Sequence, residues 1–286
     1  MDLIAVTGVP GVLGSRVAAN LNRLGRPLRL VARDPSRVPE GLEGEVVAGD
    51  YNDEAQMTAA FSGAGTIFLV SGREAEDRLE HHRRAVAAAT AAGVAKIVYT
   101  SFLGAHPRAT FVLARQHFHT EEFIRASGAR FVVLRDSMYA DFIPYFAGRD
   151  GVIRGPAGNG ETSWVTRDDI AAAATQVLIT PDHDNSILDI TGPEAVSMAE
   201  TAERLSRHIG RPITYHDETE AEAYASRASF DAPDWEVAGW VTSYQAIARG
   251  ELATVSGAVE SLTGRRPQSI EDFLTAHPES YQHLLS

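Results

Sequence analysis

Short apolar runs alternate with longer amphipathic segments over roughly the first half of the chain. The apolar runs, each a predicted strand, cover residues 3–7, 28–33, 44–50, 66–71, 96–102 and 130–135. Between them, apolar residues at helical spacing and alanine-rich stretches predict helices over residues 12–25, 53–61, 76–92 and 112–128. Buried strands that alternate with helices are typical of parallel βαβ units. Right-handed crossovers then predict a doubly wound parallel sheet, with a ligand crevice at the carboxyl ends of its strands.

The pattern changes after about residue 136. Residues 139–148 are aromatic and apolar, and residues 154–163 have the composition of a loop. Further elements are predicted as helices over 166–179 (with Asp168 or Thr166 as N-cap) and 197–208, and as strands over 186–191 and 212–217. We therefore expect an α/β protein: a Rossmann-type doubly wound sheet over residues 1–136, and a smaller C-terminal α/β lobe over 137–286 that binds substrate. The boundary is approximate, and the chain can cross back over it.

Three glycines follow the first predicted strand in the stretch "VTGVPGVLGSR", with the spacing G-x-x-G-x-x-G. In such a loop one glycine allows a tight turn, one lets the backbone approach a pyrophosphate, and one lets the helix pack on the strand. The helix that begins near Val12 then directs free N–H groups at the phosphates. The alternative is a strand–helix turn without a ligand. The residues expected to bind the dinucleotide here are Thr7, Gly8, Val9, Pro10, Gly11, Val12, Leu13 and Gly14.

The end of the second strand indicates which dinucleotide is bound. NAD sites place an acidic residue about 20 residues after the glycines, to hold the ribose 2′-OH. Arg33 stands there instead, and a guanidinium suits the 2′-phosphate of NADP(H). Alternatively, Arg33 is a surface cation. Asp50 could bond the adenine amino group or serve as a turn residue. Other residues at strand ends are expected to line the crevice: Ser71, Gly72, Thr100, Ser101 and Phe102.

Composition narrows the functions further. The formal charge of −12 disfavours nucleic acid as a partner, and the absence of cysteine removes disulfides and thiolate catalysis. No stretch reaches the roughly 18 apolar residues of a membrane span, so we expect a cytoplasmic protein without a membrane partner. No histidine and carboxylate spacing indicates a metal site. Of the 26 basic residues only Lys96 is a lysine.

The proton relay of common short-chain dehydrogenases is missing from the sequence. That relay is Tyr-x-x-x-Lys, where lysine lowers the tyrosine pKa. No tyrosine has a lysine four residues later, and Lys96 begins the fifth strand, at the far end of the sheet from the expected nicotinamide. Two classes remain: an enzyme that passes hydride to an acceptor needing little acid help, such as a quinone or dye, and a protein that senses NADP without turnover.

Several segments together resemble the NmrA-like group of atypical short-chain dehydrogenases, most of all bacterial type 2 NAD(P)H:quinone oxidoreductases and triphenylmethane reductases. These are the glycine loop and residues 30–38, 49–53, 91–105, 134–142 and 157–174. The resemblance implies a Rossmann lobe, a smaller lobe and a cleft between them. It implies that NADP(H) is held by the glycine loop, by Arg33 and by the segment from Asp136 to Asp141, which includes Ser137, Met138 and Tyr139. It also implies direct hydride transfer, and the group includes regulators that do no chemistry.

One residue departs from the group. Members usually have Asn or another small polar residue where Asp136 stands in "LRDSMY", and a carboxylate near the nicotinamide would disfavour an anionic product. The sequence alone does not assign a role to the Asp136 carboxyl group.

Aromatic and titratable side chains supply the remaining candidates. Tyr139, Phe142 and Tyr145 could form an apolar lid over a flat acceptor, and Phe102, which lines the crevice, is also expected to contact the substrate. Tyr139 is the first choice for a hydrogen bond to substrate, the alternative being a packing aromatic. His117 is the best titratable candidate, the alternative being an ordinary helix histidine. Arg167 could reach the cleft or brace its own helix.

The sequence thus predicts an NADPH-dependent oxidoreductase that reduces a quinone-like or conjugated small molecule by direct hydride transfer, as a monomer or homodimer. The alternatives are a non-catalytic NADP-sensing regulator and a tailoring reductase of a biosynthetic pathway.

Overall fold

Residues 2–285 are described by the structure, a computed structural model, and they form two compact units. Unit 1 contains the residues up to Phe102 together with Gln116–Arg135 and Ile170–Leu188. Unit 2 contains Leu103–Arg115, Asp136–Asp169 and the residues from Asp189 onward. The chain therefore crosses between the units several times, once between Arg135 and Asp136. The division into residues 1–136 and 137–286 stays a prediction.

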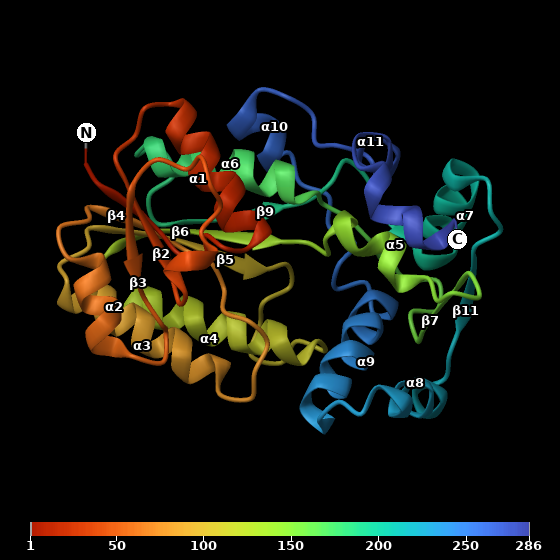
Figure 1. The fold of residues 1–286 in the computed structure, drawn as a ribbon. Helices are drawn as coiled ribbons and strands as arrows, with labels where there is room; N and C mark the ends of the chain where they lie inside the picture. Colours follow the sequence, from red (N-terminus) through yellow and green to blue (C-terminus); the bar gives the residue numbers. More distant parts are fainter. Residues whose placement is uncertain (1, 286) are drawn as a thin grey trace. The chain divides into compact units, whose positions relative to one another are not determined.

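Unit 1 is built on a parallel sheet, as the alternating pattern predicts (Figure 1). In the described residues the sheet has seven strands in the order β3-β2-β1-β4-β5-β6-β9. The strands are β1 (Ile4–Val6), β2 (Leu28–Ala32), β3 (Glu45–Ala48), β4 (Thr66–Leu69), β5 (Lys96–Phe102), β6 (Arg130–Asp136) and β9 (Ser186–Ile190). The chain starts at β1, moves to β2 and β3 on one side, and continues with β4 on the other. That reversal is the topological switch point at which doubly wound sheets bind ligands.

Helices cover both faces of this sheet. Figure 1 shows α1 and α6 on one face and α2, α3 and α4 on the other. Their bounds are α1 (Val12–Arg23), α2 (Glu54–Phe61), α3 (Arg78–Ala91), α4 (Val112–Ala126) and α6 (Arg167–Ile179), with a short 3-10 turn η1 (Pro35–Arg37) after β2. Alternate strand residues point to opposite faces, so Ala5, Ile67 and Ile97 pack against α2 and α3 in one core, together with Met57 and Phe61.

The element boundaries differ from the predicted ones by a few residues. Most strands end earlier than the apolar runs, because residues such as Thr7 and Ser71 bend into loops at the edge of the sheet. Helix α1 ends before Gly25, which has a φ of +64° and so stops the helix as expected. Of the two candidate N-caps of α6, the structure has Thr166: its Oγ1 accepts a hydrogen bond from the backbone N–H of Asp169 at 3.1 Å.

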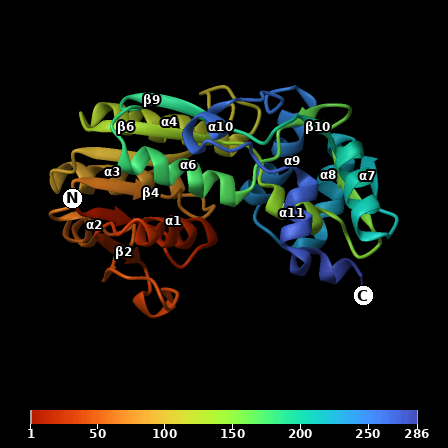
Figure 2. The same ribbon diagram turned by 90° about the horizontal axis from the view of Figure 1, so that it is seen from above.

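Unit 2 is an α/β unit of about the same size as unit 1, and its described residues form two short strand pairs. Strand β7 (Val152–Gly155) pairs in parallel with β11 (Thr214–Asp217), and β8 (Glu161–Thr162) pairs antiparallel with β10 (Val196–Ser197). Its helices are α5 (Ile143–Phe146), α7 (Met198–Ile209), α8 (Glu220–Arg227), α9 (Asp234–Ala248), α10 (Ala258–Thr263) and α11 (Ile270–Ala276), with 3-10 turns η2 (Ala140–Phe142), η3 (Ala228–Phe230) and η4 (Pro278–Leu284). Figure 2 shows the same elements from above. Across residues 2–285, no helix has both the length and the apolar character needed to cross a membrane.

Lys96, the single lysine, is a structural residue of unit 1. It is buried at the start of β5, and its Nζ donates hydrogen bonds to the carbonyl oxygens of Val177 and Thr180, each at 2.8 Å. Its third partner is the Asp184 carboxylate, also at 2.8 Å. The ammonium therefore satisfies carbonyls at the end of α6 and joins that end to the sheet.

We predict that Lys96→Met lowers the free energy of unfolding by about 2–4 kcal/mol, because carbonyls and a carboxylate lose their buried cation. Arg130→Met is the matched control, since Arg130 pairs with the same Asp184 but its side chain is 53% exposed. The control is expected to cost less than about 1 kcal/mol. Urea unfolding of both variants tests the prediction, and equal losses would contradict it.

Candidate functional site

The glycine loop forms a tight turn between β1 and α1. Gly8 has a φ of +65°, and the N–H of Gly11 donates to its carbonyl oxygen at 2.9 Å. A Cβ added at Gly14 would lie 2.4 Å from that same oxygen, so only glycine allows α1 to pack this closely on the loop. Gly11 is the N-cap of α1 and offers no side chain to the helix N-terminus. The first N–H groups of α1 are left to bind an anion.

A cavity of about 750 Å³ opens beside this loop at the carboxyl ends of the strands. Its volume lies within the range of small-molecule sites. It is lined by Thr7, Gly8, Pro10, Gly11, Val31, Ala32, Arg33, Asp34, Arg37, Gly49, Asp50, Tyr51, Asn52, Val70, Ser71, Gly72, Arg73, Ala75 and His81. The remaining glycine-loop residues do not line it: Val9 and Leu13 are buried in the core, Val12 faces outward, and Gly14 packs on Gly8.

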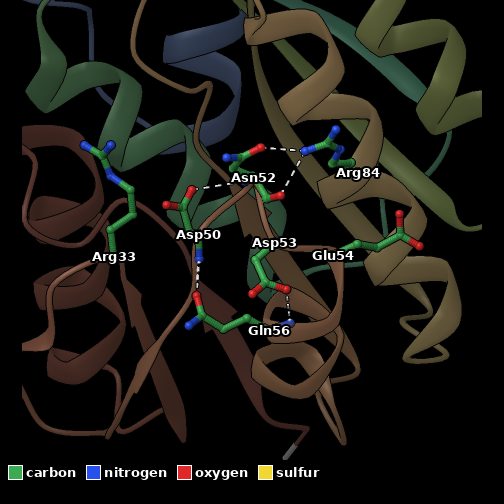
Figure 3. A pocket seen from close by; sticks show the side chains of 7 residues that line it. All are labelled: Arg33, Asp50, Asn52, Asp53, Glu54, Gln56 and Arg84. Atoms are coloured by element: carbon green, nitrogen blue, oxygen red, sulfur yellow. Dashed lines mark hydrogen bonds between the residues drawn. The ribbon is translucent and has the colours of Figure 1, made fainter.

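A second, polar pocket of about 610 Å³ shares Arg33 with this cavity (Figure 3). Arg84 lies in it with its guanidinium bound to Asn52 and Glu80. The Arg33 guanidinium, by contrast, makes no hydrogen bond or ion pair within residues 2–285. The neighbouring Asp34 carboxylate accepts hydrogen bonds from Ser36 N at 3.0 Å and Oγ at 2.7 Å, which caps η1. The end of β2 therefore presents a free cation rather than a free carboxylate.

Asp50 has a turn role in this pocket. Its Oδ1 accepts a hydrogen bond from Asn52 N at 3.0 Å, and its own N–H donates to Gln56 Oε1 at 2.8 Å. A bond from Asp50 to adenine stays a prediction.

Polar side chains at the other strand ends bind the protein itself. Thr7 Oγ1 donates to Phe68 O and accepts from Val70 N, each at 2.9 Å, and lies 2.5 Å from Tyr51 Oη. Tyr51, whose hydroxyl also donates to Val70 O at 2.8 Å, lines the cavity and was missed by the sequence argument. The only signal for it was an aromatic residue directly after a strand-end aspartate.

Thr100 and Ser101 are also engaged. Thr100 Oγ1 accepts from Ser71 N at 2.7 Å, and Ser101 Oγ donates to the buried Glu121 at 2.6 Å. Arg135 binds the same Glu121 carboxylate through two nitrogens, at 2.9 and 2.7 Å. The two hydroxyls are thus part of the scaffold behind the cavity, and neither residue lines it.

The candidates of unit 2 gather around Tyr139. Its hydroxyl donates to Asp136 Oδ2 at 3.2 Å, and its ring stacks on Phe142 with centroids 6.0 Å apart. Arg167 lies over Phe142, 5.2 Å from the ring centroid, and its Nε binds Asp141 Oδ1 at 2.8 Å. Arg167 therefore braces this segment.

The other unit 2 candidates take no part in those contacts. Tyr145 stacks on His283 instead, with centroids 4.9 Å apart. The buried Ser137 Oγ accepts from Ser163 Oγ at 3.1 Å, and Met138 offers its carbonyl to Val165 N at 2.9 Å. Their predicted cofactor contacts stay predictions.

His117 lies in a buried network of unit 1. Its Nε2 is 2.9 Å from Arg78 Nη2 and its Nδ1 is 2.9 Å from Tyr99 Oη. A guanidinium can only donate, so Nε2 accepts and the ring proton sits on Nδ1. With both ring nitrogens engaged, His117 supports Arg78, whose Nε donates to the Gly72 carbonyl at 2.8 Å. Direct catalysis by His117 stays a prediction that this geometry does not favour.

His82 holds the other side of Gly72. Its Nε2 accepts from Gly72 N at 2.8 Å, and its Nδ1 is 2.9 Å from Thr120 Oγ1. Gly72 lines the cavity, so Arg78 and His82 together fix the backbone of one cavity wall. Burial, reinforced by the nearby Arg78 charge, lowers the pKa of His82 and of His117 well below the ordinary value. Both rings are therefore neutral near pH 7.

We predict that the folded protein loses stability as the pH falls below about 6.5. Below that pH these two histidines are protonated in the unfolded chain but stay neutral in the folded protein, because burial lowers their pKa there. Their contribution is fully present above that pH. Each histidine adds a slope of up to about 1.4 kcal/mol per pH unit. His117→Gln keeps an acceptor for Arg78 but removes one titrating group, so urea unfolding between pH 5 and 7 is expected to show a shallower slope. His119→Gln, an exposed change on the same helix, is the control. An unchanged slope in His117→Gln would refute the prediction.

No group of three or more His, Cys, Asp or Glu side chains suited to a metal ion occurs in the described part of the chain.

Comparison with known proteins shows what the chain is similar to. Over 293 residues it is 31% identical to quinone oxidoreductase 2 of Escherichia coli K12, with 99% of both chains covered. It is also 31% identical over 285 residues to the (4-alkanoyl-5-oxo-2,5-dihydrofuran-3-yl)methyl phosphate reductase of Streptomyces griseus, covering 98% of this chain and 99% of that one.

Solved structures agree with these relatives. The NADPH-dependent quinone oxidoreductase of Escherichia coli, solved with NADPH, superposes with a TM-score of 0.87 at 30% identity, covering 99% of this chain and 100% of the other. The triphenylmethane reductase of Citrobacter sp., solved with NADP(H), gives 0.84 at 26% identity, covering 96% and 100%. The family model described as NmrA-like matches residues 1–231. The chain therefore belongs to the NmrA-like family, as its sequence motifs predicted.

Proposed function

We propose that this protein is an NADPH-dependent oxidoreductase that reduces a quinone-like or otherwise conjugated small molecule by direct hydride transfer. The observation that carries the proposal is the cavity beside the glycine loop, with the unpaired Arg33 at its edge. The relatives that are named as NADPH-dependent quinone and triphenylmethane reductases support it, because they match the chain over nearly its whole length.

The residues present fit NADPH. Gly8 and Gly11 line the cavity, and the N–H groups at the start of α1 suit a pyrophosphate. A side chain at Gly14 would clash with the Gly8 carbonyl and break this turn. Arg33 can hold the 2′-phosphate. The Asp34 carboxylate already accepts two hydrogen bonds from Ser36, so it does not bind the ribose 2′-hydroxyl as the acidic residue of an NAD site would. When bound, NADPH supplies a hydride.

The acceptor is proposed to bind against Tyr139 and Phe142. Their rings stack nearly parallel, at 14°, and Phe142 is 44% exposed, which offers a flat apolar surface to a conjugated ring. No lysine can act beside Tyr139 in the manner of the common relay, because the single lysine is bound at the start of β5. Tyr139 is the proposed hydrogen-bond donor to the acceptor.

We predict that Arg33→Ala lowers the preference for NADPH over NADH by about 10- to 100-fold, because the 2′-phosphate loses a charge-assisted bond. Dissociation constants for both cofactors, measured by fluorescence titration, check this. Arg266→Ala removes an exposed arginine of unit 2 and should leave the ratio unchanged. The same ratio in Arg33→Ala as in the wild type would overturn the choice of NADPH.

We further predict that NADPH oxidation is stimulated by some members of a panel of quinones, cationic dyes and conjugated lactones. The lactones are included because the relative from Streptomyces griseus is a reductase of a dihydrofuranone phosphate, which favours a tailoring role as the second candidate. Tight NADPH binding without turnover of any acceptor would instead favour a non-catalytic NADP sensor.

A further inference from the structure

The carboxyl group of Asp136 is fully buried and only half satisfied. Its Oδ2 accepts the hydrogen bond from Tyr139 Oη at 3.2 Å, whereas Oδ1 has no hydrogen-bond partner among the described residues. An ionised carboxylate is costly in such a site, and the neutral acid costs much less. Burial accordingly raises the pKa of Asp136 well above its ordinary value, and the hydrogen bond from Tyr139 opposes this only in part.

The charged groups around the pair do not neutralise Asp136. Arg167 of α6 is the cation whose field reaches Tyr139, but its backbone N–H and Nε both bind the Asp141 carboxylate, at 3.0 and 2.8 Å. Burial, followed by the nearby Asp136, raises the pKa of Tyr139 as well. The Tyr139 hydroxyl therefore keeps its proton near neutral pH, and burial favours the neutral acid form of Asp136.

When Asp136 is protonated, both the Asp136 acid and the Tyr139 hydroxyl carry a proton, and either one can donate the hydrogen bond between them. When Asp136 donates its acid proton to Tyr139 Oη, the phenolic proton of Tyr139 is free for another acceptor. Tyr139 as a residue is half-buried, while Asp136 is closed off from solvent. The pair thus joins a buried carboxyl group to a residue that is partly open to solvent.

We propose that Asp136 is the proton store of the reduction and that Tyr139 delivers the proton. The inference rests on the proposed function. The acceptor gains a hydride from NADPH, and its anionic oxygen or nitrogen takes the phenolic proton as the Tyr139 O–H bond breaks. The Tyr139 oxygen takes the proton of Asp136, which becomes a carboxylate and recovers a proton from solvent between turnovers. Each cycle consumes one NADPH, one acceptor and one proton, and it yields NADP⁺ and the acceptor reduced by two electrons.

This assignment also answers the question that Asp136 raised in the sequence. A carboxylate would repel the anionic product of hydride transfer, but an uncharged acid does not, and its proton neutralises that product.

Infrared spectroscopy of the cofactor-free protein at pH 7 tests whether the Asp136 carboxyl group is protonated. The wild type is expected to show the carbonyl band of a protonated aspartic acid, shifted by ¹³C-aspartate labelling and absent in Asp136→Asn. Asp150→Asn is the control, because Asp150 is exposed, paired with Arg154 and ionised, so the band should persist. A wild type without the band would overturn the proposal.

Kinetics test its use. Asp136→Asn keeps the shape of the side chain, and kcat is expected to fall by about 100-fold or more while the NADPH dissociation constant is unchanged. The wild-type rate should decline as the pH rises through the Asp136 titration, and this decline should vanish in the variant. The kcat of Tyr139→Phe should fall by a similar factor. The kcat of the double variant should fall no further than that of the more impaired single variant, because both residues act on one proton path. Asp150→Asn should match the wild type.

The outcomes separate the two proposals. A wild type that reduces no acceptor would refute the proposed function and this inference with it. Turnover by the wild type with an unaltered kcat and pH profile in Asp136→Asn, or additive losses in the double variant, would refute the proton store alone. Should Asp136→Asn fail to fold, the labelled wild-type spectrum and Tyr139→Phe still decide the matter.

Discussion

The close approach of helix α1 to the carbonyl of Gly8 is the constraint on which the rest of unit 1 depends. An added Cβ at Gly14 would lie 2.4 Å from that oxygen, so the helix can begin beneath the loop only without a side chain there. This contact directs the N-terminus of α1 at the cavity and brings the carboxyl ends of β1, β2 and β4 around it. The anion site that we propose here would thus be a consequence of backbone packing rather than of particular side chains.

The side chains at the strand ends mostly strengthen that backbone. Thr7 joins β1 to the residues after β4, and Thr100 holds Ser71 N–H from β5. The neutral His82 and the cation of Arg78 grip the two sides of the Gly72 peptide. With these groups engaged in the scaffold, ligand recognition at this edge is left to backbone N–H groups and to the unpaired Arg33. Such a rigid first layer is what precise positioning of a cofactor requires.

Lys96 and Asp136, the two residues that the sequence singled out by their charge, differ in their surroundings. Lys96, the single lysine, is fully employed in structure at the end of β5 that lies away from the cavity. Asp136, an extra carboxyl beside Tyr139, is buried with no hydrogen-bond partner for its Oδ1 among the described residues, and burial raises its pKa well above the ordinary value. We propose that Asp136 supplies protons to the acceptor through Tyr139, in a chain whose sequence has no Tyr-x-x-x-Lys motif.

Hydrophobic periodicity and turn residues were sufficient to predict the alternating strands and helices of unit 1, because buried parallel strands and their crossover helices leave a strong local pattern. The glycine spacing and Arg33 predict a phosphate-binding edge, because glycine conformation and charge are properties of single residues. Phosphate binding at that edge stays a prediction. The hydrogen-bond partners of the polar side chains depended on the tertiary structure. Sequence could not show that Thr7 is saturated by residues 44 and more positions away, or that His117 faces Arg78 and Tyr99. It could not show that Asp136 is buried. Desolvation and hydrogen bonding between distant segments fix which polar groups remain available for chemistry, and only the folded chain decides them.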